Sequence, residues 1–400
     1  MNRKLWVLMA TAFVDMLGFA MVFPLLPFYA KDLGARPIMI GVLISSFSVA
    51  QLATSPLWGR FSDRFGRRPV LLIGLAAAGI AYIVFGLASS IWRSLWLLLL
   101  SRTVQGAGGG TTGVVQAYIA DSTAPSERAK ALGWLSACTS AGVMIGPGIG
   151  SLAAHIGHAA PGFIAAALCF LNVAFAWRYL PESRPRLGAP KRGVRAALWN
   201  VVLHPGTPQS RLILIYAVGM AAFAAMSSVV ALYLNYQFGV TAKTIGLVFV
   251  YIGGLAVVMR ALVLGWAVDR LGEARVMRVG AFIFAVGLAL YAVPTKIWIL
   301  ALIIPLVPIG QALLFPSVTA LSTHRADPEE RGQMMGVQQA FGGAARVLGP
   351  LGATWAFQQF GPASPFLIAS AIMLFVTVLT FAIPVRTNER DAPPVAVPNS

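Results

Sequence analysis

Two long apolar stretches of the chain are separated by the segment Gly59-Arg60-Phe61-Ser62-Asp63-Arg64-Phe65-Gly66-Arg67-Arg68-Pro69. Half a chain length later, the related segment Gly265-Trp266-Ala267-Val268-Asp269-Arg270-Leu271-Gly272 again lies between two apolar stretches. Four residues of the first copy recur in the second at the same mutual spacing: Gly59, Asp63, Arg64 and Gly66. A repeat of half the chain in an apolar protein is typical of a transporter built from two related helical bundles.

The composition is that of a membrane protein. Apolar residues make up 58% of the chain, charged residues 11%, and the mean hydropathy is +0.77. Soluble domains carry about 25% charged residues. The charges of this chain are bunched between apolar runs of about 20 residues, each long enough to cross a bilayer core of about 30 Å as a helix. We therefore predict an all-α integral membrane protein.

We expect twelve transmembrane helices, six in each half of the chain. Their predicted ranges are 5–29, 38–58, 70–91, 95–120, 130–153, 161–180, 210–234, 242–267, 275–294, 297–322, 332–356 and 364–384. These ranges predict an N-terminal bundle over 1–180, a linker over 181–209, a C-terminal bundle over 210–385 and a disordered tail over 386–400. The first apolar run follows a basic start but lacks a cleavage site, so we expect it to be retained as a span.

The basic residues predict the orientation of these spans. If the N-terminus is cytoplasmic, 22 of the 30 basic residues face the cytoplasm, as the positive-inside rule requires. Both termini are then cytoplasmic. Because six spans return the chain to its starting side, the two halves have the same orientation. This distribution also accounts for the net charge of +17 without a nucleic-acid partner.

The chain shows no pattern typical of an enzyme or a metal protein. Cys138 and Cys169 lie in apolar stretches, and the four histidines form no ligand cluster. No set of nucleophile, base and oxyanion donors is apparent. We therefore expect no enzymatic activity, no metal and no cofactor.

Parallel halves, a cytoplasmic linker and the Gly-x-x-x-Asp-Arg-x-Gly loop resemble the major facilitator superfamily. The resemblance covers essentially the whole chain and implies two parallel six-helix bundles, with both termini cytoplasmic. Within the superfamily, the chain is most similar to the twelve-span drug/proton antiporters, which include tetracycline-resistance and multidrug efflux transporters.

The loop after the second span matches the signature loop of the superfamily, in which it acts as a latch between the halves. Gly59 and Gly66 permit a close approach and a sharp turn. Asp63 is placed to accept from the N-terminal end of a facing helix, which we expect to be the eleventh span. The residues expected to form the latch are Gly59, Asp63, Arg64, Gly66, Arg67 and Asp121, in which Arg67 pairs with Asp121. The alternative is a basic loop that only fixes topology.

The two copies of the loop are unequal. Glu273-Ala274 stands in the second copy where the first has Arg67-Arg68. We therefore expect a full latch in the first half only.

The fifth span contains a cluster of glycines around a proline. Proline frees a carbonyl and kinks the helix, and the glycines let another helix approach closely. This stretch resembles a motif of the superfamily's drug/proton antiporters, although Ser151 stands where a last glycine is common. The residues assigned to the motif are Gly142, Gly146, Pro147 and Gly150. The alternative is ordinary helix packing.

Asp15 and Arg102 are the candidates for proton coupling. Asp15 is the only acidic residue well inside a predicted span, and a carboxyl group in a low-dielectric cavity can take up and release a proton. Arg102 lies in a stretch of the fourth span that resembles a superfamily motif tied to proton translocation. Alternatively, Asp15 is a structural residue paired with Arg102, or Arg102 is satisfied by neighbouring carbonyls.

Other polar and aromatic residues are candidates for substrate binding. Arg260 and Arg346 lie inside spans of the second half without an acidic helix partner. We expect them to bind an anionic or chelating group of the substrate; the alternative is a pair with Asp15 across the interface between the halves. The family fold implies that spans 1, 4, 7 and 10 line a central cavity. The candidate substrate contacts are Gln105, Gln116, Phe223, Arg260, Gln311 and Arg346. Scattered amides on an aromatic wall suit a bulky amphipathic molecule.

The predicted function is proton-coupled export of drugs or similar lipophilic compounds by alternating access. The alternatives are uptake or exchange of an organic anion, and a membrane sensor or scaffold without transport. The predicted partners are a small lipophilic substrate, protons and the lipid bilayer. We expect a monomer in a bacterial inner membrane.

Overall fold

The computed structural model describes residues 3–124, 127–183, 199, 201–324 and 331–383. Every regular element in these residues is a helix, which confirms the all-helical class. The first half contains α1 (Arg3–Val22), α2 (Leu26–Asp32), α3 (Pro37–Phe65), α4 (Arg67–Ser89), α5 (Leu95–Gly109), α6 (Thr112–Ser122), α7 (Arg128–Ala154) and α8 (Ala160–Tyr179). The second half contains α10 (Pro208–Phe238), α11 (Ile245–Val258), η1 (Met259–Val263), α12 (Leu264–Leu271), α13 (Glu273–Tyr291), α14 (Ile297–Ile303), α15 (Leu306–His324), α16 (Arg331–Phe360) and α17 (Ser364–Phe381).

Ten helical stretches are long and apolar enough to cross a membrane. They coincide with ten of the twelve ranges predicted from the sequence. The other two ranges, 95–120 and 332–356, are also helical but do not meet the same measure of length and apolarity. The first is interrupted at Gly110, and the second carries Gln338, Gln339 and Arg346. The predicted tail and most of the predicted linker lie outside the described residues.

Several predicted spans are divided into two helical segments. Pro24 lies in the turn between α1 and α2, and Pro305 lies in the turn between α14 and α15. Proline removes a helical hydrogen bond and clashes with the preceding turn, which accounts for both breaks. The break between α5 and α6 follows three glycines, Gly106, Gly108 and Gly109. Glycine destabilises a helix interior more than any other residue except proline.

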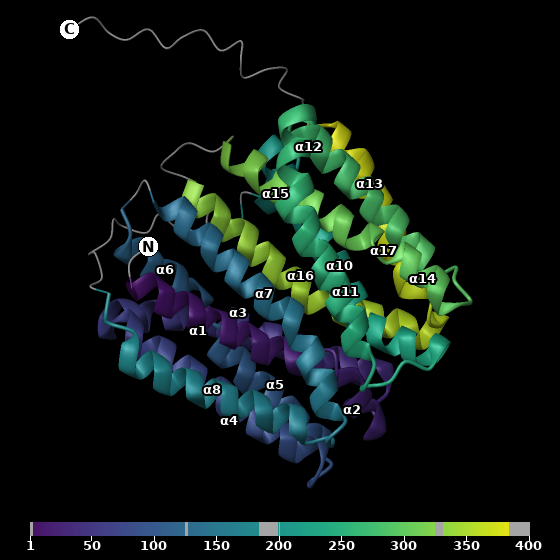
Figure 1. The fold of residues 1–400 in the computed structure, drawn as a ribbon. Helices are drawn as coiled ribbons and strands as arrows, with labels where there is room; N and C mark the ends of the chain where they lie inside the picture. The colour runs from purple at the N-terminus through teal and green to yellow at the C-terminus, as the bar shows by residue number, and fades with distance from the viewer. Residues whose placement is uncertain (1–2, 125–126, 184–198, 200, 325–330, 384–400) are drawn as a thin grey trace, which may run out of the picture.

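The helices of each half pack mainly against one another. In Figure 1 the purple-to-teal helices of the first half lie at the lower left and the green-to-yellow helices of the second half at the upper right. In the first half α1 packs on α7 and α8, and α4 packs on α5 and α8. In the second half α10 packs on α16 and α17, and α13 packs on α15 and α17. The halves meet mainly through two pairs of helices, α3 with α16 and α7 with α11, and α2 also contacts α10.

Hydrogen bonds connect the halves at one end of the molecule, called the joined end, which carries residues 31–38, 151–158 and 235–246. Lys31 Nζ donates to Asn235 Oδ1 at 2.5 Å, and the Ile38 amide donates to Gln358 Oε1 at 3.3 Å. The hydroxyl of Ser151 lies 2.7 Å from the Gly246 amide, from which it accepts a bond. It also donates to the Ala242 carbonyl at 2.9 Å.

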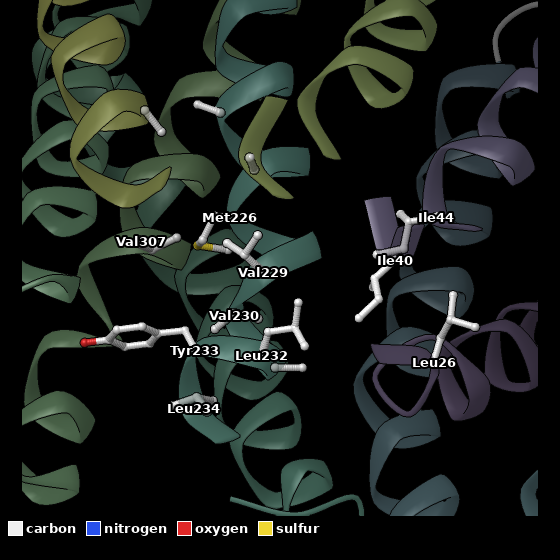
Figure 2. Close-up of a cluster of buried hydrophobic side chains, with 14 of the residues drawn as sticks. Leu26, Ile40, Ile44, Met226, Val229, Val230, Leu232, Tyr233, Leu234 and Val307 are labelled. Atoms are coloured by element: carbon white, nitrogen blue, oxygen red, sulfur yellow. The ribbon is translucent and has the colours of Figure 1, made fainter. Parts of the chain in front are cut away.

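The buried apolar side chains near the joined end belong to both halves. One cluster includes Leu26 and Ile40 of the first half and Met226 and Leu232 of the second. Figure 2 shows Ile40 of α3 and Leu232 of α10 turned toward each other across the boundary. Because these side chains are withdrawn from solvent together, their burial favours contact between the halves at this end.

Candidate functional site

Asp15 lies in the middle of α1 and is half-buried. Its carboxylate accepts no hydrogen bond from the residues that the structure describes. It is close enough to Tyr82 of α4 and Cys169 of α8 to interact electrostatically with both. Asp15 is therefore an acidic group among helices of the first half without a neutralising partner among those residues.

Arg102 of α5 is buried, with 1% of its surface exposed. Its guanidinium lies over the rings of Phe19 and Phe47, with the Cζ atom 5.8 and 5.2 Å from the ring centroids. Aromatic faces attract cations. Nη1 donates to Gln105 Oε1, whereas the buried Nε finds no acceptor. The ion pairs among the described residues do not include one between Asp15 and Arg102, so the structural pairing considered from the sequence is not formed in this structure.

Tyr82 connects these two charged residues. Its hydroxyl accepts a hydrogen bond of 2.5 Å from Gln105 Nε2, and Gln105 in turn accepts from Arg102. Its ring lies against α1, where a Cβ atom added to Gly18 would be 3.4 Å from Tyr82 Cε2. Sequence reasoning missed Tyr82. The available signal was its position, since Tyr82 is the only side chain with a polar oxygen or nitrogen between Val70 and Ala88.

The structure brings together only some of the predicted substrate contacts. Gln105 lies between Arg102 and Tyr82. Its Oε1 atom accepts from Arg102, and its Nε2 atom donates to Tyr82. Gln116 of α6 and Arg260 of η1 are exposed, and within the described residues neither forms a hydrogen bond with another candidate. Arg260 lies in a five-residue π-helical turn, Met259–Val263, a feature frequent at functional sites.

The remaining candidates lie in α10, α15 and α16 of the second half. Phe223, Gln311 and Arg346 are half-buried. The Nε2 atom of Gln311 is buried without a hydrogen-bond partner among the described residues. Arg346 lies beside Tyr216 and interacts with it electrostatically.

Arg67 lies at the centre of the predicted latch and is 8% exposed. Its Nη1 atom donates to Ser62 Oγ and to Asp63 Oδ1, each at 2.6 Å. Its Nε atom donates to Asp121 Oδ2 at 3.2 Å, so the pair expected between Arg67 and Asp121 is present. The first side chains of α16 lie outside the described part, and the proposed contact of Asp63 with that helix stays a prediction.

The two glycines of the latch behave differently. Gly66 has a φ of 98°, a left-handed conformation that glycine adopts without strain, and it forms the sharp turn between α3 and α4. Gly59 has open space where a Cβ atom would lie, so the close approach expected there is absent from this structure. Arg64, another residue of the predicted latch, is exposed. Its guanidinium stacks over Phe65, with 5.2 Å between the Cζ atom and the ring centroid.

Glu182 is a further member of this cluster that the sequence did not indicate. Its Oε1 atom accepts from the Arg67 amide at 2.7 Å, and its Oε2 atom accepts from the Arg68 amide at 3.2 Å. These amides belong to the first turn of α4, where a helix carries unpaired N–H groups and favours negative charge. Glu182 thus ties the segment after α8 to the start of α4.

The second half contains a related pair with exchanged charges. His324 Nδ1 lies 3.2 Å from Glu273 Oε2. Glu273 stands 206 residues after Arg67, at the same position of the repeated loop, and His324 stands 203 residues after Asp121, at the end of the corresponding helix. The second copy thus has a polar tie of its own, which the comparison of Glu273-Ala274 with Arg67-Arg68 did not reveal.

The glycines of the predicted antiporter motif lie where α7 meets α1. A Cβ atom added to Gly142 would lie 2.6 Å from the Phe13 carbonyl oxygen. One added to Gly146 would lie 2.7 Å from Ala20 Cβ, and one added to Gly150 would lie closer still to the Met21 carbonyl oxygen. Another face of the same stretch meets α11, where the Pro147 carbonyl and Ser151 contact Gly246. The motif therefore packs α7 against the helix that bears Asp15 and against the second half.

A comparison with protein families identifies the chain. The sequence model of the Major Facilitator Superfamily matches residues 8–263 and 212–399. The chain belongs to the Major Facilitator Superfamily. It is accordingly a membrane transporter and not an enzyme, as predicted.

Curated members of the superfamily resemble the chain over most of its length. The tetracycline resistance protein, class C, of Escherichia coli is 32% identical over 360 residues, which cover 88% of each chain. The multidrug resistance protein 2 of Bacillus subtilis is 27% identical over 402 residues, which cover 96% of each chain.

Solved structures of the superfamily share the fold. The human organic anion transporter MFSD10 has a TM-score of 0.70 at 22% identity, covering 94% of this chain and 99% of its own. A bacterial homologue of the lysosomal transporter Spinster has a TM-score of 0.79 at 14% identity, covering 96% and 97%. At these identities the similarity concerns the fold alone.

Proposed function

We propose that the protein exports drugs or similar lipophilic compounds in exchange for protons. The observation that carries this proposal is the environment of Asp15. A half-buried carboxylate without a neutralising partner in the described residues is costly to keep charged inside a membrane, so it takes up and releases protons readily. The related tetracycline and multidrug resistance proteins support the drug-efflux part of the proposal.

Tyr82, Gln105 and Arg102 extend the site away from Asp15. A change in the charge of Asp15 alters the electrostatic potential at the Tyr82 hydroxyl, which is hydrogen-bonded to Gln105. Gln105 also orients Arg102. Protonation of Asp15 is thereby coupled to the position of a second buried charge.

The joined end supports the alternating-access part of the proposal. In this structure Lys31, Ser151 and Asn235 take part in bonds between the halves. A transporter that opens at this end has to break these bonds, while the proposed latch of Asp63 and Arg67 holds the opposite end. Protonation and substrate binding then favour opposite states.

The remaining features of the proposal concern topology. We propose twelve spans, with both termini cytoplasmic, in a bacterial inner membrane. The proposed domains are a bundle over 1–180, a linker over 181–209 and a bundle over 210–385, acting as a monomer. The ten apolar helices and the basic residues between them support this arrangement.

Reconstitution in lipid vesicles tests the function. With an imposed pH gradient, the wild-type protein should accumulate a tetracycline, a fluoroquinolone or a cationic dye. Asp15→Asn should abolish the gradient-driven component. Asp32→Asn, which removes an exposed carboxylate at the end of α2, is the matched control and should retain it. The export proposal would be wrong if the vesicles took up an organic acid but showed no proton-driven flux of these compounds.

A further inference from the structure

Arg346 is a cation within the second half that lacks an anionic partner. It is half-buried on α16, and among the described residues it donates no hydrogen bond and forms no ion pair. No Asp or Glu occurs in any of the six predicted spans of the second half, so no helix of that half supplies a carboxylate. A guanidinium presents five N–H donors in a planar fork that fits carboxylates. Leaving it unpaired at this depth is unfavourable.

Polar groups of three helices gather around this arginine. Tyr216 of α10, which is 7% exposed, interacts electrostatically with Arg346, and its hydroxyl lies beside the side-chain amides of Gln339 and Gln338. The Tyr216 ring lies against α16, where a Cβ atom added to Gly342 would be 2.9 Å from Tyr216 Cε1. Tyr216 and Arg346 therefore flank the same turn of α16.

Two buried amide atoms of this region lack hydrogen-bond partners in the described residues. Gln338 is 2% exposed, and its Nε2 atom donates to Thr319 Oγ1 at 2.8 Å while its Oε1 atom is unpaired. Gln311 Nε2, two turns before Thr319 on α15, is also unpaired. Buried polar atoms without partners are uncommon, and two in one region point to a place for a polar ligand.

An aromatic surface adjoins these polar groups. The rings of Phe315 and Tyr216 meet edge to face, with centroids 5.5 Å apart. Phe223 lies seven residues after Tyr216 on α10, which places it on the same face two turns away. A ligand with an acidic group and a planar apolar body would match both kinds of surface.

We propose that Arg346, Tyr216 and Gln338 form a subsite for an acidic group, a carboxylate or an acidic enol, of an amphipathic substrate. Arg346 binds the anion through paired N–H donors, and Tyr216 donates to the same group. Gln338 and Gln311 complete the polar contacts, and Phe315 and Phe223 pack on the apolar body. The proposal rests on the proposed transport function and specifies the substrate class.

A pair of dyes that differ in one carboxylate tests the subsite. Rhodamine 123 is the methyl ester of rhodamine 110, so only rhodamine 110 offers a free carboxylate. Binding to the purified full chain in detergent is followed by fluorescence polarisation, without any pH gradient. We expect rhodamine 110 to bind about tenfold more tightly, as one charge-assisted contact of about 1.4 kcal/mol predicts.

Variants of the subsite provide the decisive comparison. Arg346→Gln should remove the preference by weakening rhodamine 110 about tenfold while rhodamine 123 binds as before, which also shows that the variant is folded. Tyr216→Phe, which keeps the ring, should weaken rhodamine 110 a few-fold, and it serves in place of Arg346→Gln if that variant does not fold. Arg275→Gln removes the same charge from an exposed position of the same half and should change neither dye.

The proposal is overturned if wild-type protein binds the two dyes equally or binds neither, or if Arg346→Gln weakens both equally. Because binding needs no gradient, its outcome is separate from that of the transport assay. If the protein prefers the dye with the free carboxylate but shows no proton-driven flux, the subsite proposal stands and the export proposal is wrong. If it shows proton-driven flux but no preference between the dyes, the export proposal stands and the subsite proposal is wrong.

Discussion

Glu273 Oε2 lies 3.2 Å from His324 Nδ1, at the positions in the second half that correspond to Arg67 and Asp121 in the first. In each half, the start of one helix is tied to the end of a neighbouring helix. The two contacts differ in burial: the side chains of Arg67 and Asp121 are 10% and 11% exposed, whereas those of His324 and Glu273 are 55% and 21% exposed. Because exposed ion pairs contribute little to stability, the contact in the first half is expected to be the stronger of the two.

Asp121→Ala should destabilise the protein more than Glu273→Ala does. The Asp121 carboxylate accepts from Arg67 Nε at 3.2 Å, and both side chains are nearly buried, so its loss leaves a buried guanidinium nitrogen without its acceptor at a cost of about 1–3 kcal/mol. Glu273 and His324 are more exposed, which limits the effect of Glu273→Ala to about 1 kcal/mol or less. Thermal unfolding of the purified proteins measures both effects. Asp269→Ala serves as the exposed control, and equal unfolding temperatures for the Asp121 and Glu273 variants would contradict the prediction.

Gly146→Ala should destabilise the protein, whereas Gly133→Ala in the same helix should not. The added methyl group at Gly146 meets Ala20 Cβ and the Leu17 carbonyl oxygen at 2.7 Å. Forcing a methyl group into such a contact costs about 1–3 kcal/mol. Nothing lies within 4 Å of the corresponding position at Gly133, where alanine improves helix propensity. Equal unfolding temperatures for the two variants would show that α1 and α7 are not packed as described.

Ser151→Ala should weaken the joined end. Its hydroxyl donates to the Ala242 carbonyl and accepts from the Gly246 amide, and both bonds cross between the halves. Their loss costs about 1 kcal/mol, which changes the ratio of closed to open molecules by roughly fivefold. Distances between spin labels at the exposed positions Ile156 and Lys243 report this ratio. Thr139→Ala removes a hydroxyl of α7 that bonds within its own helix, and an identical shift there would refute the role of Ser151.

Tyr82→Phe should reduce proton-driven accumulation more than it reduces substrate binding. The substitution keeps the ring against α1 but leaves Gln105 Nε2 buried without its acceptor, at a cost of about 1–3 kcal/mol. We expect gradient-driven flux to fall roughly tenfold, with a changed dependence on pH, while dye binding without a gradient is retained. Tyr179→Phe, at an exposed tyrosine, is the control. A parallel loss of flux and binding would assign Tyr82 a purely structural role.

Much of the fold follows from local sequence properties. The apolar runs and the duplicated loop at Gly59 predicted two halves of related helices, because span length and charge placement are set by the bilayer. The described helices occupy the predicted ranges within a few residues. The turn at Pro305 and the break at Gly110 were not predicted. The spans were predicted from continuous apolar sequence, and a turn at a proline or glycine does not interrupt that continuity.

The site was less accessible to sequence reasoning, because its members meet across long chain distances. Glu182 contacts Arg67 from 115 residues away, and no pattern near either residue announces the contact. Tyr82 was overlooked because one aromatic residue in an apolar helix is most often a packing residue. In contrast, Asp15 and Arg102 stood out at once, since charged residues within spans are rare and costly.

The glycines of α7 have a mechanical consequence. Gly142 and Gly146 bring the backbone of α7 against that of α1, and the next face of the same turns meets α11. At these two positions the backbones of α1 and α7 are close enough to leave little room for one helix to slide along the other. Under the proposed exchange mechanism, a displacement of α1 that follows protonation of Asp15 would therefore move α7 as well. A looser contact here would uncouple the two helices, and the proposed exporter would then pass protons without moving substrate.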